Sequence, residues 1–222
     1  MMNIIKQEQV FPTLLEHCTI LSIFKKGKKG ENYLNNYRGI FRVNIFRSIL
    51  DRLIFNYYYG KIYNYLSDRN VGGRRGRNIR DNLFVLNAIT NNVTKGKVEP
   101  CDIAAYDAEK CFDSLWAQEC INDIWDAGCR DDKLSLLHLE NQIAQVVVKT
   151  PGGNSEPNTI KNVIMQGGVM GSILCTSTMD KLGKIVYSDK DLVYNYKGTD
   201  VPCLQMVDDI LTITKCHPTA PK

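Results

Sequence analysis

The order of apolar and polar residues along the chain predicts a mixture of helices and strands. Apolar residues three and four positions apart favour helices, and short runs rich in β-branched or aromatic residues favour strands. Helices are predicted over residues 44–66, about 79–93, about 114–127, about 132–144 and 171–187. Strands are predicted over residues 18–25, 98–107, 145–149, 159–165, 192–196, 201–207 and 210–214. We therefore expect an α+β fold.

Several helix ends carry capping residues. Asn44 is placed to cap the first long helix, and Asn78 with Asp81 has the spacing of a capping box for the second. Gly128 follows the third helix as a C-cap residue. The predicted inward faces are Phe46, Ile49, Leu50, Leu53, Tyr57 and Tyr65 in the first helix, Ile79, Leu83, Leu86, Thr90 and Val93 in the second, and Leu115, Trp116, Cys120 and Ile124 in the third.

The segment LQMVDDILTI, residues 204–213, places Asp208 and Asp209 between two predicted strands. Neighbouring residues within a strand point to opposite faces, so two such aspartates could not both reach one ligand. The two-residue turn of a hairpin relaxes this restriction, and Asp tolerates such turns. We therefore expect the pair at a hairpin tip. Two interpretations are open, a polar turn between core strands and a ligand site.

A third carboxylate favours the ligand site. Asp107 ends a predicted strand just before a helix. If that strand pairs beside the hairpin of residues 201–214, Asp107 and Asp208 converge. Convergent carboxylates suit Mg²⁺, and two ions about 3.5–4 Å apart can activate an attacking hydroxyl and stabilise a leaving pyrophosphate. The chemistry implied is nucleotidyl transfer on a nucleic-acid template.

Charge is distributed unevenly along the chain. Residues 1–97 hold 17 Lys and Arg against 6 Asp and Glu, giving +11, and residues 98–222 hold 11 against 18, giving −7, which together recover the net charge of +4. A basic first part suggests a polyanionic partner, with a solvated surface as the alternative. The residues expected to meet template phosphates are the arginines of the loop at residues 70–82, Arg74, Arg75, Arg77 and Arg80.

Composition excludes several classes of protein. The longest apolar run is four residues, so we expect no transmembrane helix and no membrane partner. The first residues lack the layout of a signal peptide. The eight cysteines include no CxxC pair, which favours reduced thiols in an intracellular protein, nuclear or cytoplasmic. A zinc site is unsupported, because His17, His138 and His217 share no ligand spacing with the cysteines.

Five segments, in order, resemble the motifs of one family. They are FKKGKKGENYLNNYRGI (24–40), NVGGRRGRNIRDNLF (70–84), DAEKCFD (107–113), VVVKTPGGNSEPNTIKNVIMQGGVMGS (146–172) and MVDD (206–209). In the same order, the family motifs that they resemble are P-K-K-G followed by N-Y-R-P-I, Q-x-G-F-R-x-G-R-S, D-x-x-K-A-F-D, the hairpin leading into a Q-G motif, and an aromatic-x-D-D box. Over roughly residues 18–215, the chain resembles a reverse transcriptase of the non-LTR (LINE-like) retrotransposon group.

The resemblance implies a role for each matching position. Asp107 and Asp208 would ligate two Mg²⁺ ions (or Mn²⁺), with the carbonyl of Ala108 as a further ligand and Asp209 in a supporting catalytic role. Phe112 resembles the steric gate that excludes a ribose 2′-hydroxyl, with a core aromatic as the alternative. Asp113 follows the family pattern but also suits a helix N-cap, which we prefer. The implied nucleotide-binding residues are Lys25, Lys26, Arg38, Gln166 and Gly167, the lysines having a solvated loop as the alternative.

The chain also departs from the family pattern. Gly39 replaces a proline, Gly73 a phenylalanine and Met206 an aromatic residue, and residues 168–172 replace C-P-L-S-P. The chain stops 13 residues after Asp209, so we expect fingers and most of a palm without the helical thumb. Within one reverse transcriptase domain, residues 1–97 would form the fingers and residues 98–222 an antiparallel palm sheet with packed helices.

The function implied is RNA-directed DNA polymerisation from dNTPs on a primed RNA or DNA template. Two alternatives stay open, a non-catalytic nucleic-acid-binding remnant of a decayed retroelement and an RNA-directed RNA polymerase. Whether this stretch of chain is active alone, and its oligomeric state, are left open by the sequence.

Overall fold

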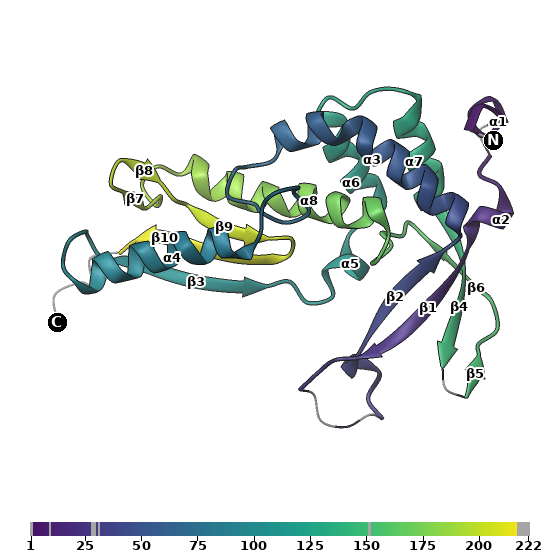
Figure 1. Cartoon of the computed structure of the whole chain (residues 1–222), viewed down its shortest axis with the longest axis horizontal. Coiled ribbons are helices and arrows are strands. Elements are labelled where there is room, and N and C mark those ends of the chain that lie inside the picture. The colour runs from purple at the N-terminus through teal and green to yellow at the C-terminus, as the bar shows by residue number, and fades with distance from the viewer. Residues whose placement is uncertain (1, 9, 28–29, 31, 151, 217–222) are drawn as a thin grey trace. The chain divides into compact units, whose positions relative to one another are not determined.

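The fold is described from a computed structural model (Figure 1), which describes residues 2–8, 10–27, 30, 32–150 and 152–216. Lys28 and Lys29 of the predicted basic loop, Pro151 of the predicted hairpin turn and His217 lie outside the described residues. The chain divides into two compact units, Met1–Ile62 with Phe112–Cys175 and Tyr63–Cys111 with Thr176–Lys222. Each unit is assembled from two separate stretches of chain. The assignment of residues 1–97 and 98–222 to functional regions stays a prediction.

The first unit is built on a five-stranded sheet. Its strands are β1 (His17–Phe24), β2 (Tyr37–Val43), β4 (Ile143–Thr150), β5 (Gly153–Asn154) and β6 (Asn158–Lys161). β1 pairs antiparallel with β2 and parallel with β4, and β4 also pairs with β5 and β6. Buried Cys18, Ala144, Val146 and Met165 form a core cluster here. The helices of this unit are α1 (Met2–Glu8), α2 (Thr13–Glu16), η1 (Leu34–Asn36), most of α3 (Ile45–Tyr65) and of α5 (Cys111–Ser114), α6 (Ala117–Asp126), α7 (Asp132–Gln142) and the first turns of α8 (Val169–Ser188).

The second unit is built on a three-stranded antiparallel sheet. Its order is β3 (Cys101–Asp107), β10 (Asp209–Lys215) and β9 (Cys203–Met206). The helix α4 (Ile79–Thr94) runs along this sheet in Figure 1 and buries Ile89 against Leu204 and Ile213. A small hairpin of β7 (Asn195–Tyr196) and β8 (Thr199–Asp200) also belongs to this unit, as do the later turns of α8 and the end of α3. The α+β fold with an antiparallel sheet and packed helices is as predicted.

The predicted helix caps are confirmed. The side chain of Asn44 accepts a hydrogen bond from the Phe46 amide at 2.9 Å. Asn78 and Asp81 form the predicted capping box of α4, and Gly128 adopts a φ of +88° after α6. These caps depend on residues two to four positions apart, which is why the sequence alone identifies them.

The buried face of α3 differs from the prediction. Leu50 is buried as expected, but Phe46, Ile49, Leu53 and Tyr57 are about half exposed. The buried seam instead consists of Arg47, Leu50, Asp51, Ile54, Phe55, Tyr58 and Ile62. Two charged residues lie in this seam because buried Glu140 of α7 pairs with Arg47 at 2.7 Å. A sequence pattern that places all charged residues on the solvent side therefore predicts the wrong buried face for α3.

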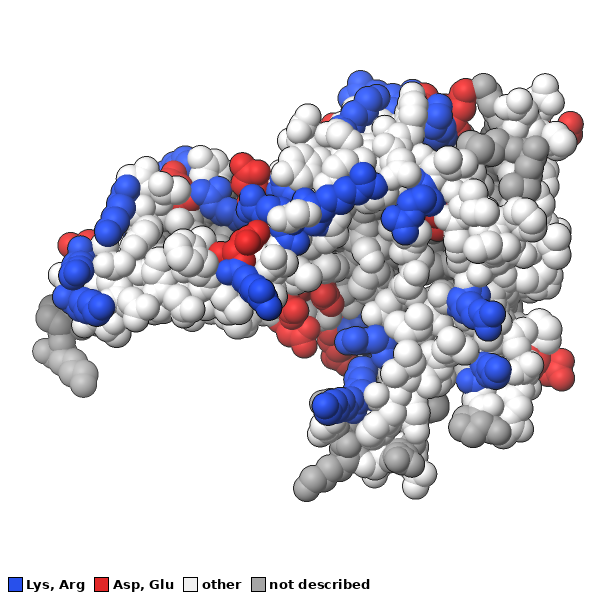
Figure 2. Space-filling view, viewed as in Figure 1, with Lys and Arg blue, Asp and Glu red and all other residues white. Residues whose placement is uncertain are grey.

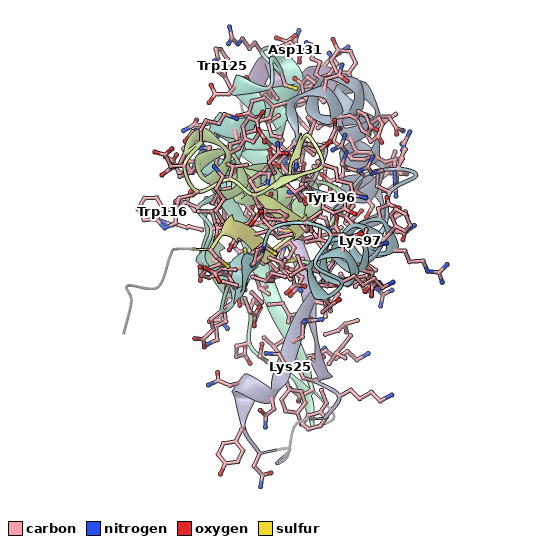
Figure 3. The ribbon with its side chains drawn as sticks, turned by 90° about the vertical axis from the view of Figure 1, so that its left-hand side faces the viewer. Lys25, Lys97, Trp116, Trp125, Asp131 and Tyr196 are labelled. Atoms are coloured by element: carbon pink, nitrogen blue, oxygen red, sulfur yellow. The ribbon has the colours of Figure 1, made fainter. Side chains whose placement is uncertain are left out.

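Several other elements correct the sequence prediction. The helix expected over residues 114–127 is divided into α5 and α6, and Trp116 at the junction is 72% exposed rather than inward, pointing away from the ribbon in Figure 3. Asp113 lies inside α5, so it is not the N-cap of α6, a position that Trp116 takes. On α4, Ile79 and Leu83 are exposed while Asn82 is buried. The structure adds α1, α2 and β2, which the sequence did not predict, and shortens the strand of residues 192–196 to β7.

Within the described part of the chain, no helix is both long and apolar enough to cross a membrane. All eight cysteines are free, and burial raises the pKa of the Cys129 and Cys203 thiols to about 11. Free thiols agree with the predicted absence of a disulfide framework.

Candidate active site

The paired aspartates lie at the end of the β9–β10 hairpin in the second unit. Met206 pairs with Asp209, so the two-residue turn consists of Val207 and Asp208. This corrects the predicted turn by one residue, since Asp209 is the first residue of β10 rather than part of the turn. Val207 has a φ of +59°. A β-branched residue rarely adopts this left-handed conformation, which marks the turn as a strained position.

Asp107 stands directly opposite Asp209. β3 and β10 are antiparallel neighbours, and their register pairs these two residues. Side chains paired across antiparallel strands have Cβ atoms about 4.5–5.5 Å apart and lie on the same face of the sheet. The predicted convergence of the strand end with the hairpin is therefore present, with Asp209 as the direct cross-strand partner.

Electrostatics also link the three carboxylates. Burial, followed by the charges of Asp208 and Asp107, holds the pKa of Asp209 above its usual range. Repulsion of this kind requires the like charges to be close together. Asp107 and Asp209 are exposed and Asp208 is half-buried, so the group is open to solvent. Figure 2 shows acidic side chains gathered near the C-terminal end of β3.

A cavity of about 290 Å³ adjoins the carboxylates within the second unit. Asp107 and Asp209 line it together with Tyr106. Apolar side chains form most of the remaining wall, Ile79, Leu83 and Leu86 of α4 and Ala105, Leu204, Met206, Ile210 and Leu211 of the sheet. The charged groups therefore border an apolar depression, where an electrostatic interaction is less screened than in open water.

The donor set fits a hard divalent cation bound with its substrate. Among the described residues, no three His, Cys, Asp or Glu side chains are arranged to hold a metal ion by themselves. Mg²⁺ commonly takes only one or two protein carboxylates and completes its shell with phosphate oxygens and water. Asp107, Asp208 and Asp209 can supply those carboxylates, and half-buried Ala108 follows β3 directly.

The glycine-arginine loop before α4 supports the hairpin, which the sequence did not predict. Residues 69–71 run beside β9, where the Val71 amide donates to the Gln205 carbonyl at 3.0 Å and the Gln205 amide donates to the Arg69 carbonyl at 3.1 Å. The side-chain amide of Asn82 donates to the same Gln205 carbonyl at 2.9 Å. This loop therefore extends the sheet at the edge next to the Asp208 turn.

Arg74, one of the four loop arginines, uses its side chain for hydrogen bonds to backbone carbonyls in and next to the loop. Arg74 is 6% exposed and donates to the Ser67 carbonyl at 2.6 Å, and its guanidinium lies 4.1 Å from the centre of the Tyr63 ring. It is therefore not placed to meet a phosphate, contrary to the expectation from sequence. Arg77 is half-buried and pairs with Asp81 at 3.2 Å. Arg75 and Arg80 are exposed, and Figure 2 shows basic side chains gathered over this loop.

The residues expected to hold the nucleotide lie in the first unit. Arg38 is exposed on β2, two residues before Ile40. The Gln166 carbonyl accepts from the Phe41 amide of the same strand at 2.9 Å. Gly167 has a φ of +106°, and a Cβ there would lie 3.0 Å from Cγ2 of Ile40 and 3.1 Å from the Phe41 carbonyl oxygen. The Gln166–Gly167 turn thus packs on the strand that carries Arg38, and only glycine fits this approach.

The remaining candidates occupy separate places in this unit. Lys25 follows β1, and its ammonium group donates to the Asn35 carbonyl at 3.1 Å, near the end of the β1–β2 hairpin in Figure 3. Lys26 is exposed in the same turn. Phe112 is half-buried in α5, five residues after Asp107 in sequence.

The architecture is that of the fingers and palm of a nucleic-acid polymerase. The family described as reverse transcriptase (RNA-dependent DNA polymerase) matches residues 24–219. The chain therefore belongs to the reverse transcriptase family. A comparison with curated proteins found no matching relative.

Solved telomerase structures share the fold. The apo telomerase of Candida tropicalis, truncated from its C-terminal domain, matches with a TM-score of 0.59 and 17% identity over 96% of this chain and 48% of its own. Another apo structure of that enzyme matches with a TM-score of 0.61 and 13% identity, over 92% and 40%. Telomerase of Candida albicans, in complex with a fragment of telomeric RNA, matches with a TM-score of 0.58 and 12% identity, over 92% and 38%. The chain thus spans less than half of each, and these identities establish likeness of fold alone.

Proposed function

We propose that this protein is the catalytic core of an RNA-directed DNA polymerase that adds deoxynucleotides to a primer 3′-hydroxyl. The observation that carries the proposal is the pairing of Asp107 with Asp209 across β3 and β10, beside the Asp208 turn. In a member of the reverse transcriptase family, such a group of carboxylates is suited to hold the divalent ions of nucleotidyl transfer. RNA as template is supported by the telomerase neighbours, one of which was solved with telomeric RNA.

Each candidate residue has a task in this proposal. Asp107 and Asp208 hold two Mg²⁺ ions, the Ala108 carbonyl adds a ligand, and Asp209 keeps the site strongly negative. When bound, Mg²⁺ supplies the positive charge that activates the 3′-hydroxyl and stabilises the leaving pyrophosphate. Because the carboxylates repel one another, the free site favours cation binding.

The proposed contacts to nucleotide and template rest on the matching motifs and on the exposure of the basic residues. Arg38, with Lys25 and Lys26 in the adjoining turn, presents positive charge to the triphosphate. Gln166 and Gly167 pack on the same strand, and in this proposal their backbone approaches the nucleotide. The arginines that contact template phosphates are the exposed Arg75 and Arg80, with Arg77 at the edge of the loop.

Three finer assignments also belong to this proposal. Phe112 acts as the gate that selects deoxynucleotides over ribonucleotides. The five ordered motifs assign the chain to the non-LTR retrotransposon group of the family. Residues 1–97 form the fingers region and residues 98–222 the palm.

Primer extension tests the proposal. The protein, its Asp208→Ala variant and an Asp191→Ala control are incubated with poly(rA)/oligo(dT), dTTP and Mg²⁺, and binding of the same duplex is measured on filters. Asp191 is an exposed aspartate of the same unit, so the control makes the same charge change elsewhere. We expect extension by the protein and the control, and none by Asp208→Ala, which still binds duplex. Duplex binding by all three without extension would instead identify a nucleic-acid-binding remnant, and incorporation of UTP as readily as dTTP would identify an RNA polymerase.

A further inference from the structure

The backbone turn that presents Asp208 is held in a conformation that its own sequence does not favour. Val207 is the first residue of the two-residue turn and has a φ of +59°. At this position of a hairpin turn, a positive φ usually requires glycine or asparagine. A β-branched residue stays in this region only where its surroundings hold it there. The neighbours of Val207 therefore determine where the Asp208 carboxylate points.

Three contacts constrain the turn, and two of them are hydrogen bonds to Gln205, two residues before Val207. Its carbonyl accepts two hydrogen bonds, from the Val71 amide at 3.0 Å and from the side chain of Asn82 at 2.9 Å. Asn82 and Gln205 are both buried, at 7% and 0% exposed. A buried carbonyl with two donors fixes the strand in both position and register. The end of β9 is thus fastened to the loop and to α4 just before the turn.

The third constraint is steric and acts on Val207 itself. Gly72 is buried, and a Cβ at this residue would lie 2.4 Å from the backbone nitrogen of Val207 and 3.0 Å from its Cα. The φ of Gly72 lies outside the left-handed region, so alanine would be compatible with its backbone. The glycine is therefore needed for the close approach to the turn rather than for its own conformation. The Asn70 side chain accepts from the Gly72 amide at 3.1 Å and holds this approach in place.

We propose that Gly72 and Asn82 are positioning residues, which set the backbone of the Val207–Asp208 turn and thereby aim Asp208 at its cation. That Asp208 binds a cation rests on the proposed function, whereas control of the turn by Gly72 and Asn82 does not. The loop before α4 then has a second task besides presenting arginines to nucleic acid. Asn82 also lines the cavity beside Asp107 and Asp209, but the role proposed for it and for Gly72 is exerted through the backbone of residues 205–208.

The first test uses Gly72→Ala with Gly60→Ala as its matched control. Gly60 lies within α3 and has open space where a Cβ would be added, so the same substitution there moves nothing. Two quantities are measured on the folded full chain, Mn²⁺ affinity by electron paramagnetic resonance and amide hydrogen exchange of residues 203–209. We expect Gly72→Ala to weaken Mn²⁺ binding by about tenfold or more, as loss of a residue supporting a metal ligand does. We also expect faster exchange of the Gln205 amide, with Gly60→Ala unchanged in both.

The second test uses a milder change, in case Gly72→Ala does not fold. Asn82→Ala removes one of the two donors to the Gln205 carbonyl, and Asn87→Ala is its control because Asn87 is an exposed residue of the same helix. Asn82→Ala is expected to weaken Mn²⁺ binding and speed exchange at residues 203–209 in the folded protein, and Asn87→Ala to do neither. A merely structural role would lower the melting temperature of Asn82→Ala without changing the Mn²⁺ affinity of its folded form.

The outcomes separate this proposal from the proposed function. Wild-type affinity and exchange in folded Gly72→Ala, or in Asn82→Ala where the first does not fold, would overturn the positioning role. If the wild-type chain binds no Mn²⁺, the proposed metal site is refuted, while the exchange of residues 203–209 still decides whether Gly72 and Asn82 hold the turn.

Discussion

The buried pair of Arg47 and Glu140 offers a sharp test of how the first unit is held together. Arg47 is 1% exposed and donates through Nε to the Glu140 carboxylate at 2.7 Å and through Nη2 to the Glu140 carbonyl at 2.5 Å. Its guanidinium also lies 5.4 Å from the centre of the Phe11 ring. The charge of Asp51 also acts on Glu140 and raises the pKa of its carboxyl group. The perturbations we consider are Glu140→Leu and Glu140→Gln.

The expected magnitudes differ because the two variants leave Arg47 in different surroundings. Leucine removes the side-chain acceptor and leaves a buried charge short of its partner, which typically costs about 3–5 kcal/mol. Glutamine keeps an acceptor for Nε, whereas leucine keeps none; the backbone bond to residue 140 and the nearby Asp51 are present in both variants. What is lost is the difference between a charged and a neutral acceptor, so we expect Glu140→Gln to cost less than about 1.5 kcal/mol.

The pH dependence of the same variants has a definite sign. Burial, and then the charge of Asp51, raises the pKa of Glu140 well above its usual value of 4.5. A group whose pKa is higher in the folded than in the unfolded state contributes stability, and this contribution is complete below the unfolded-state pKa. It is lost as the pH rises through the folded-state pKa. The glutamine side chain does not titrate, so its contribution to stability does not change with pH. The stability of Glu140→Gln relative to wild type should therefore improve as pH rises from about 4.5.

Urea unfolding of the wild-type chain and both variants between pH 4.5 and 8 measures these differences, with Glu119→Leu and Glu119→Gln as controls. Glu119 is exposed on α6, so its variants should stay within about 0.5 kcal/mol of wild type. A cost below about 1 kcal/mol for Glu140→Leu, or a relative stability of Glu140→Gln that falls with pH, would refute the reasoning.

Three further predictions concern the candidate site. Asp209→Asn should raise the melting temperature of the metal-free protein at pH 7 and have little effect near pH 3.5, because the raised pKa of Asp209 makes its ionised form unfavourable. Scanning calorimetry in EDTA measures this difference, and an equal effect at both pH values would contradict it. Phe112→Ala should raise the use of UTP relative to dTTP by about 10- to 100-fold if Phe112 is the gate; an unchanged ratio of kcat/KM values would identify a core aromatic instead. Combined Arg75→Ala and Arg80→Ala should lower the salt dependence of duplex binding by about two phosphate contacts, whereas Arg74→Ala should lower stability and leave that slope unchanged; filter binding across salt concentrations distinguishes them.

What the sequence predicts well is what neighbouring residues determine. The caps of α3 and α4 depend on side chains a few positions apart, and the order of helices and strands follows the apolar periodicity. The sequence predicts Asp107 near the hairpin because this residue ends a strand. It does not predict which residue Asp107 faces, because the register of β3 against β10 is set by pairing between distant segments.

What the sequence does not predict depends on distant partners. Glu140, which brings Arg47 into the core, lies 93 residues from it, so nothing local marks the charged side of α3 as the buried one. The left-handed conformation of Val207 contradicts the local preference of valine, so the sequence pattern places the turn one residue too late. The signal that could have identified the support for this turn was the glycine pair at residues 72–73, since a buried glycine often marks a close backbone approach.

The most direct test of the central claim, that Asp107 belongs to the metal site of a polymerase, is dTTP incorporation on poly(rA)/oligo(dT) as a function of Mg²⁺ concentration. It compares the wild-type chain with Asp107→Ala, and Asp102→Ala on the same strand controls for the loss of charge. We predict saturable, Mg²⁺-dependent incorporation by the wild-type chain and Asp102→Ala, and none by Asp107→Ala at any Mg²⁺ concentration. Incorporation by Asp107→Ala at the wild-type rate would contradict the account.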